Sequence, residues 1–197
     1  MIKVDKIDVN YVQQGGVCVW ASYSIIIDYY SNKFINHTQI FSRFIDHLRP
    51  EFDSLITNTL ATGPVGQMER TKENLITDIY QKHCVNNGDI RGFDYITDLH
   101  NTNILGTKEY CVVKGNKAVK TGSIPQSEKM GLRDDLKNIG GLAMVLYPEY
   151  RDWHSIVVGY DSGKNNYFKR DPNKNKICND DFLLKENICE YIWFSDK

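Results

Sequence analysis

Apolar side chains are concentrated in one long run near the start of the chain. Residues 18–30 read CVWASYSIIIDYY, carry a single charge at Asp28, and are apolar on nearly every helical face. A helix that is apolar all round is buried in the middle of a protein. The pattern therefore predicts a central buried helix that begins at Cys18 and ends near Tyr30, with Trp20 and the isoleucines 25–27 in the core.

Two further helices are predicted in the first half of the chain. The second has an N-cap at Thr38, a stop at Arg49-Pro50, and apolar residues at helical spacing: Ile40, Phe41, Phe44, Ile45 and Leu48. The third follows Thr71, and its core face consists of Leu75, Ile76, Ile79 and Tyr80. Between them, ATGPVGQ at 61–67 has the composition of a turn and is expected to form a loop.

The second half of the chain has the pattern of strands. Residues 114–130 are polar and lysine-rich without a steady period, which predicts an exposed loop with solvated lysines. A short helix is expected next, with Leu132, Leu136 and Ile139 inward and Gly140-Gly141 at its end. Strand-like runs then cover 142–148, 154–161, 166–171 and 191–194, and DSGKNN forms a hairpin turn between two of them.

Helices followed by strands indicate the α+β class. We expect a helical lobe over about residues 1–100 that faces an antiparallel sheet lobe over about residues 105–197. A chain of 197 residues suits one domain with a core of its own. The sequence therefore predicts a single domain over 1–197, without internal repeats.

Composition and charge narrow the possible partners. With 41% hydrophobic and 25% charged residues and a net charge of −1, nothing favours a nucleic-acid partner. No run of about 18 apolar residues predicts a membrane span. The first residues, MIKVDKIDVNYV, lack the apolar centre of a secretory signal, so a cytoplasmic location is expected.

The cysteines and the missing motifs indicate chemistry without a cofactor. An odd number of cysteines at irregular spacing fits a reducing compartment rather than a disulfide framework: Cys18, Cys84, Cys111, Cys178 and Cys189. The chain has no C-x-x-C pair and no H-E-x-x-H, so no zinc site is expected. Glycine-rich phosphate loops are also missing, so we expect neither a metal nor a nucleotide.

Cys18 stands at the junction of a glycine turn and the predicted central helix, in QQGGVCVWASY. A free thiol has a pKa of about 8.5, and a helix N-terminus with a nearby imidazolium lowers such a value by several units. The unpaired N–H groups of a first helical turn point toward a sulfur at this position. By itself, however, Cys18 fits a small buried core residue better than a nucleophile, so a partner must be identified.

His154 is the histidine best placed to be that partner. His37, His47 and His83 lie at the edges of predicted helices among polar neighbours, and His100 lies in a predicted loop. His154 instead begins the strand-like run HSIVVGY after a polar bend. A ring at the start of a buried strand has a fixed orientation, as a general base requires.

Asp171 is the residue best placed to orient His154. A catalytic histidine needs an acceptor on its second ring nitrogen. Asp171 ends the next strand, in KRDPN, and in a hairpin that end lies beside the start of the preceding strand. Asp161 belongs to the turn end of the hairpin, and Asp152 is too close in sequence to reach around the ring. We therefore expect a catalytic triad of Cys18, His154 and Asp171, although each residue alone also fits a structural role.

The order and setting of these residues resemble the papain-like cysteine peptidases. The likeness is carried by two stretches, QQGGVCVWAS and HSIVVGYDSGKNNYFKRDPN, which cover about a sixth of the chain. The separation of 136 residues between Cys18 and His154 is similar to the separation between the catalytic Cys and His in papain-type enzymes. The nearest branches are the bacterial double-glycine-type peptidases and the YopT-like type III effector cysteine proteases. The resemblance implies a papain-like α+β fold, with the nucleophile helix in the helical lobe and a thiolate–imidazolium pair in the cleft between lobes.

The resemblance also implies an oxyanion hole. In papain-like enzymes a glutamine lies five or six residues before the nucleophile, which corresponds to Gln13, with Gln14 as the fallback. Together with the backbone N–H of Cys18, such an amide contributes on the order of 3 kcal/mol to the transition state. One departure is that papain-type enzymes place Trp directly after the nucleophile, whereas here Val19 precedes Trp20.

Three functional classes remain open at this stage. The first is a thiol peptidase that cleaves a protein or peptide substrate through an acyl-enzyme. The second is a glutamine deamidase or another acyl-transfer enzyme, because the same triad attacks side-chain amides. The third is an inactive binding protein with a papain-like fold. The effector likeness implies a host protein as target and a host cytoplasm, reached without a signal peptide, as a second location.

Overall fold

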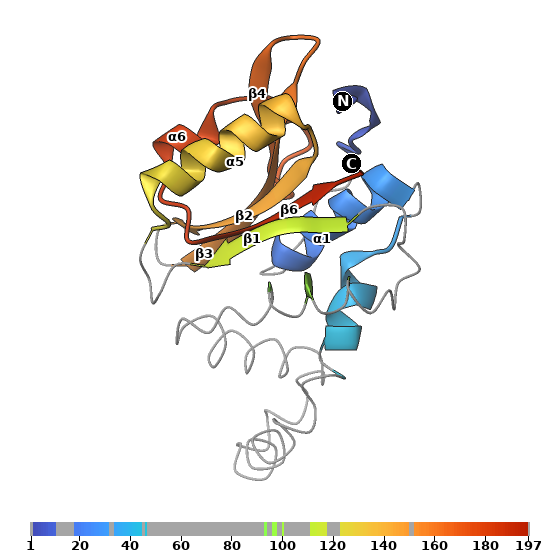
Figure 1. The fold of residues 1–197 in the computed structure, drawn as a ribbon. Helices are drawn as coiled ribbons and strands as arrows, with labels where there is room; N and C mark the ends of the chain where they lie inside the picture. Colours follow the sequence, from blue (N-terminus) through green and yellow to red (C-terminus); the bar gives the residue numbers. More distant parts are fainter. Residues whose placement is uncertain are drawn as a thin grey trace.

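The structure is a computed structural model that describes residues 2–10, 18–31, 34–44, 46, 93, 96, 97, 100, 111–117, 123–149 and 152–196. Within these residues the protein belongs to the α+β class (Figure 1). In chain order the elements are η1 (Val4–Lys6), α1 (Cys18–Ser31), β1 (Cys111–Lys117), α5 (Gln126–Asn138), β2 (Leu142–Glu149), β3 (Asp152–Asp161), β4 (Asn166–Arg170), β5 (Ile177–Asn179), α6 (Phe182–Lys185) and β6 (Glu190–Ser195).

The described strands form a six-stranded sheet in the order β1-β6-β2-β3-β4-β5. Every neighbouring pair is antiparallel, which confirms the predicted antiparallel sheet. β2, β3, β4 and β5 follow one another both along the chain and across the sheet, whereas the last strand, β6, inserts between β1 and β2. The turn at 162–165 joins β3 to β4 as predicted, and Asn165 adopts a positive φ of 52° there.

The sheet is buried on both faces, by α1 on one and by α5 and α6 on the other (Figure 1). Side chains of a strand alternate between the faces of a sheet. On β2, Leu142, Met144 and Leu146 accordingly pack with α1, whereas Ala143, Val145 and Tyr147 pack with α5 and α6. This double burial explains why β2, β6 and the second half of β3 are largely apolar in sequence rather than alternating.

The predicted central helix is confirmed as α1, and its first ten residues are all buried. Trp20 packs against Phe44 and Phe41, with ring centroids 4.5 Å and 5.8 Å apart. These two phenylalanines belong to the second predicted helix, which is present at residues 37–44. The predicted N-cap, Thr38, is wrong: the side chain of Asn36 accepts a hydrogen bond from the backbone N–H of Thr38 at 2.9 Å, and an Asn cap satisfies that donor.

The end of α1 holds segments from both ends of the chain. The hydroxyl of Tyr29 accepts a hydrogen bond from the backbone N–H of Lys3 at 3.0 Å. The hydroxyl of Tyr30 donates to the carbonyl of Phe194 in β6 at 2.8 Å and accepts from the N–H of Leu142 at 3.2 Å. The N-terminal segment and two central strands are therefore attached to one helix end.

The predicted exposed loop over 114–130 is wrong at both of its ends. Residues 114–117 belong to β1, which pairs with β6, and α5 begins at Gln126. β1 lies at an edge of the sheet, where lysines are common, and its register shifts between Val112 and Lys114. Such an irregularity interrupts the two-residue period, so the strand has no clear signal in the sequence.

The prediction for α5 is correct for two of its three inward residues. Leu132 and Leu136 are buried, whereas Ile139 is 39% exposed because the helix ends there and the chain turns away. Gly140 and Gly141 make the turn with φ of 95° and 105°, values that suit glycine. The indole N–H of Trp193 donates to the carbonyl of Gly140 at 3.0 Å and so attaches this turn to β6.

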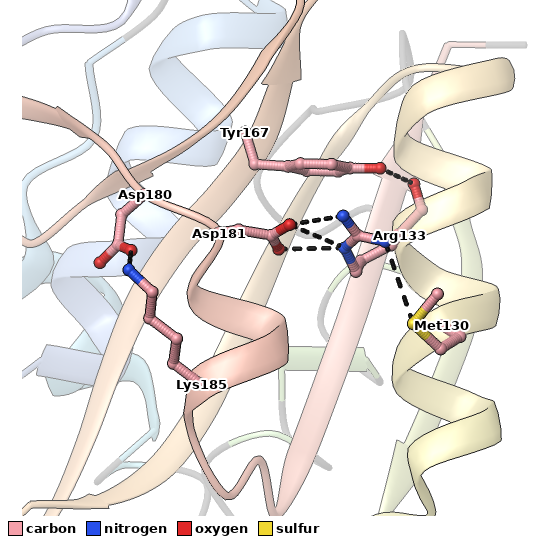
Figure 2. Close-up of polar contacts among 6 residues, drawn as sticks. All are labelled: Met130, Arg133, Tyr167, Asp180, Asp181 and Lys185. Carbon is pink, nitrogen blue, oxygen red and sulfur yellow. Dashed lines mark hydrogen bonds and ion pairs between the residues drawn. The ribbon is translucent and has the colours of Figure 1, made fainter.

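Polar contacts attach α5 to α6 and to the sheet (Figure 2). Nε of Arg133 donates to both carboxylate oxygens of Asp181, at 3.0 and 3.1 Å. The guanidinium also lies 4.4 Å from the ring centroid of Tyr167, whose hydroxyl donates to the carbonyl of Arg133. Lys129 is buried and donates to the carbonyl of Glu186 at 3.2 Å, so the predicted solvation of the lysines in 114–130 is wrong for this residue.

Several predictions fall outside the described residues. They include the helix after Thr71 and the loop at 61–67, and the division into lobes near residue 100 stays a prediction. In the part of the chain that the structure describes, no helix has the length and apolar character needed to span a bilayer.

Candidate active site

Cys18 is the first residue of α1, the helix that packs against β3. Its Sγ lies 3.8 Å from the carbonyl oxygen of Trp153, one residue before His154. The side chain is buried among apolar neighbours, with 8% of the residue exposed. The packing of α1 on the sheet thus brings this thiol to the start of β3.

His154 is the third residue of β3 and only 5% exposed. Its register partner on β2 is Tyr147, whose ring lies edge-on to the imidazole with centroids 5.6 Å apart. Tyr147 belongs to the apolar cluster of α5 and α6, whereas Cys18 belongs to that of α1. The ring of His154 therefore lies beside Tyr147 on the face of the sheet that packs with α5 and α6.

Asp171 follows β4 directly and is 7% exposed. The pairing of Arg170 with Val157 places the end of β4 beside the middle of β3. Oδ1 of Asp171 lies 2.9 Å from Nε2 of His154. The structure therefore brings these two residues together as the hairpin spacing predicts.

A tight turn over residues 171–174 shapes the surroundings of Asp171. The backbone N–H of Asn173 donates to Oδ1 at 2.9 Å, and Nζ of Lys174 lies 3.1 Å from Oδ2. The turn closes through a hydrogen bond from the N–H of Lys174 to the carbonyl of Asp171 at 2.9 Å. The guanidinium of Arg170, fully buried, donates to the carbonyls of Asp171 and Lys174, and its Nε donates to that of Asp8.

The electrostatics of the site favour a charged pair. Burial alone would raise the pKa of Asp171, but the hydrogen bonds from His154, Asn173 and Lys174 hold it well below its usual range. Burial likewise opposes the imidazolium, but hydrogen bonds to Asp171 and Cys18 and the charges of both groups raise the pKa of His154 to about 10. Both shifts favour the ion pair between the imidazolium and the carboxylate.

Cys18, His154 and Asp171 all lie near the start of β3. Asp171 occupies Nε2, whereas the hydrogen bond of the Cys18 thiol goes to the carbonyl of Trp153, the residue before His154. Since one ring nitrogen is taken by Asp171, Nδ1 remains for the thiol. The structure thus joins His154 to Asp171 directly and brings Cys18 to the backbone beside His154, at the start of β3.

The described histidines and the aspartate that were considered as alternatives to His154 and Asp171 lie in different surroundings. His100 is helical and buried against Phe194, with ring centroids 5.6 Å apart, so its predicted place in a loop is wrong. Burial lowers the pKa of His37. The carboxylate of Asp161 accepts hydrogen bonds from the N–H groups of Gly163 and Lys164, at the opposite end of the hairpin from His154.

Some candidates lie outside the described residues: Gln13, Gln14, the glycines 15 and 16, His47, His83, and the side chain of Asp152. Of the other cysteines, Cys189 is buried, and burial with the neighbouring Glu190 raises the pKa of its thiol to about 11. Cys178 is half-buried on β5. Both are free thiols, as is Cys18.

Sequence reasoning missed three residues around the triad: Tyr147, Arg170 and Lys174. The signal for Lys174 is the motif D-P-N-K, because Pro and Asn after Asp favour a turn that folds the fourth residue back onto the first. A polar cavity of about 280 Å³ adjoins this turn, and Asp171 and Lys174 line it together with Tyr147, Glu149, Lys169 and Glu186. Tyr147 and Arg170 have no comparable local signal, since strand register and burial create their contacts.

Within the described residues, no three side chains of His, Cys, Asp or Glu are grouped as a metal site would require. Comparisons of the chain with protein-family models, curated proteins and solved structures found no match. The interpretation of the site therefore rests on its own residues and contacts.

Proposed function

We propose that this protein is a thiol peptidase with a papain-like fold, in which Cys18 is the nucleophile, His154 the acid and base, and Asp171 the orienting group. One observation carries the proposal. Nε2 of the buried His154 lies 2.9 Å from Oδ1 of the buried Asp171, and Sγ of Cys18, at the start of α1, lies 3.8 Å from the carbonyl oxygen of Trp153, the residue before His154. A buried structural cysteine does not require an imidazole with an ionised acceptor behind it.

The contacts support a two-step reaction. Sγ of Cys18, as a thiolate, forms a bond to the carbonyl carbon of the scissile peptide, and the imidazolium of His154 protonates the leaving amine as the C–N bond breaks. Neutral His154 then takes a proton from a water whose oxygen attacks the thioester. Breaking of the C–S bond releases the acid and restores the thiolate and the imidazolium. Throughout, Asp171 holds the ring and stabilises its positive charge.

The remaining parts of the proposal extend from the resemblance. Gln13, or Gln14 as the fallback, supplies an amide donor to the oxyanion together with the backbone N–H of Cys18. The substrate is a protein or peptide. For an effector of the YopT-like kind, the target is a host protein and the place of action is the host cytoplasm.

The test compares the wild-type protein with Cys18→Ala on a mixture of denatured proteins. We expect new peptide N-termini, detected by mass spectrometry, with the wild type and none with the variant, because the variant lacks the nucleophile. Circular dichroism checks that the variant is folded. Intact chains that gain about 1 Da at glutamines would instead identify a deamidase, and equal results for the two proteins would refute a catalytic role of Cys18.

A further inference from the structure

The carboxylate of Asp171 is held at both of its oxygens. Oδ1 accepts hydrogen bonds from Nε2 of His154 and from the backbone N–H of Asn173, each at 2.9 Å. The other oxygen, Oδ2, lies 3.1 Å from Nζ of Lys174. The side chain of Asp171 is 9% exposed and that of Lys174 is 55% exposed, so the ammonium covers the carboxylate from the solvent side.

The turn itself places Lys174 at this position. Pro172 fixes φ at the second residue, and the N–H of Lys174 bonds to the carbonyl of Asp171 at 2.9 Å. The guanidinium of Arg170 donates to the carbonyls of both Asp171 and Lys174 and so holds the two ends of the turn together. The side chain of Lys174 therefore starts beside the carboxylate that it contacts.

Lys174 carries a positive charge, unlike most of the titratable groups around Asp171 and His154. The titratable side chains that face Asp171 and His154 come from every packed element: Cys18 of α1, Tyr147 and Glu149 of β2, Lys169 of β4, and Glu186 after α6. Lys169 pairs with Asp180 at 2.9 Å, whereas Lys174 pairs with Asp171. A positive charge at 3.1 Å offsets part of the charge of the carboxylate.

We propose that Lys174 is a positioning residue that holds the outer oxygen of Asp171 and limits the negative charge that this carboxylate presents to His154. The effect of Lys174 on catalysis rests on the proposed function, a thiol peptidase. A carboxylate without Lys174 would bind the imidazolium proton more tightly. His154 would then release that proton less readily to a leaving amine.

A charge series at position 174 tests the proposal in the full-length chain. The pKa of His154 is measured by NMR through pH 10, close to the value that the structure indicates, with His154→Gln used to assign the signal. We expect Lys174→Arg to leave this pKa unchanged and Lys174→Met to raise it by about half a unit, as for a partly exposed ion pair. Lys174→Glu should raise it further, and 1 M salt should reduce both shifts.

The chain contains a matched control at the other end of the same hairpin. Lys164 pairs with Asp161 in the same i, i+3 relation, at 3.9 Å. Lys164→Met should leave the titration of His154 unchanged. An equal shift in this control, or no rise or a fall in Lys174→Met, would overturn the role of Lys174.

The result of the charge series does not depend on whether the protein is a peptidase. The titration needs no substrate and no cleavage, since it reports on the pKa of His154, and Cys18 is the same in every variant of the series. An ordered charge series in a protein that cleaves nothing would support the role of Lys174 and reject the peptidase. Cleavage that depends on Cys18, with a flat charge series, would support the peptidase and reject the role of Lys174.

Discussion

At the scale of single residues, burial does not distinguish His154 from His100. The two are 5% and 8% exposed, and each has an aromatic ring at 5.6 Å. His154 has a carboxylate partner, since Oδ1 of Asp171 lies 2.9 Å from its Nε2. The sequence identified His154 through its place at the start of a strand and its 17-residue distance from Asp171. Spacing within a hairpin was therefore more informative than polarity.

Replacing Asp171 by Asn keeps the shape of the side chain and removes its charge. Burial would raise the pKa of Asp171, but its hydrogen bonds keep it below the ordinary value. Such a carboxyl contributes stability above its unfolded pKa of about 3.9, and this stability is lost as the pH falls toward the folded value. We expect the wild type to exceed Asp171→Asn in free energy of unfolding by about 1–3 kcal/mol at pH 6.

The difference in free energy of unfolding between the wild type and Asp171→Asn should become smaller as the pH falls from 5 to 3. Over this range the unfolded wild type takes up a proton that the folded protein does not, so wild-type stability falls with the pH. Urea denaturation at several pH values measures both curves. A gap that stays constant with pH would contradict the proposed ionisation of Asp171.

At the scale of elements, the site depends on how α1 and the β3–β4 hairpin meet. α1 carries Cys18 to the start of β3, and β4 returns Asp171 to the same place. β2 lies next to β3 and starts from the turn at Gly140 and Gly141. That turn therefore sets where β2, and with it the ring of Tyr147 beside His154, enters the sheet.

Gly141→Ala should destabilise the protein strongly. A Cβ at this position would collide with the backbone oxygen of Phe194, and the φ of 105° is unfavourable for alanine. We expect a loss of more than about 2 kcal/mol in the free energy of unfolding, measured by urea denaturation. Gly163→Ala is the control, because its Cβ would meet only the movable side chain of Asp161, at 3.3 Å. Equal stability of the two variants would contradict this account.

At the scale of the whole molecule, long apolar runs were predicted well and short polar elements were not. α1, β2, β3 and β6 are each anchored by an apolar run that the core requires, and the turn before β4 marks the start of that strand. β1 has a register shift and lies at the sheet edge, while β5 and α6 have three and four residues, too few for a period to show. Pairing with neighbours distant in sequence stabilises these elements, so local patterns do not reveal them.

The residues of the candidate site can also be divided into those with a local signal in the sequence and those without one. Cys18, His154 and Asp171 were found because helix start, strand start and hairpin end are local signals that one topology brings together. The ion pair of Lys174 was not found, because many lysines of this chain are exposed and their sequence does not say which one contacts a carboxylate. The sheet brings Asp171 to His154, and the turn after β4 adds Asn173 and Lys174 around the carboxylate.

The most direct test of the central claim is the rate at which iodoacetamide alkylates Cys18 at pH 6, followed by peptide mapping. Cys178 is the internal reference, since it is more exposed than Cys18 and lies on an edge strand. If Cys18 is a thiolate paired with His154, it should react at least about tenfold faster than Cys178, and His154→Gln should remove this advantage. Labelling of Cys18 no faster than that of Cys178, or an unchanged rate in His154→Gln, would contradict the account.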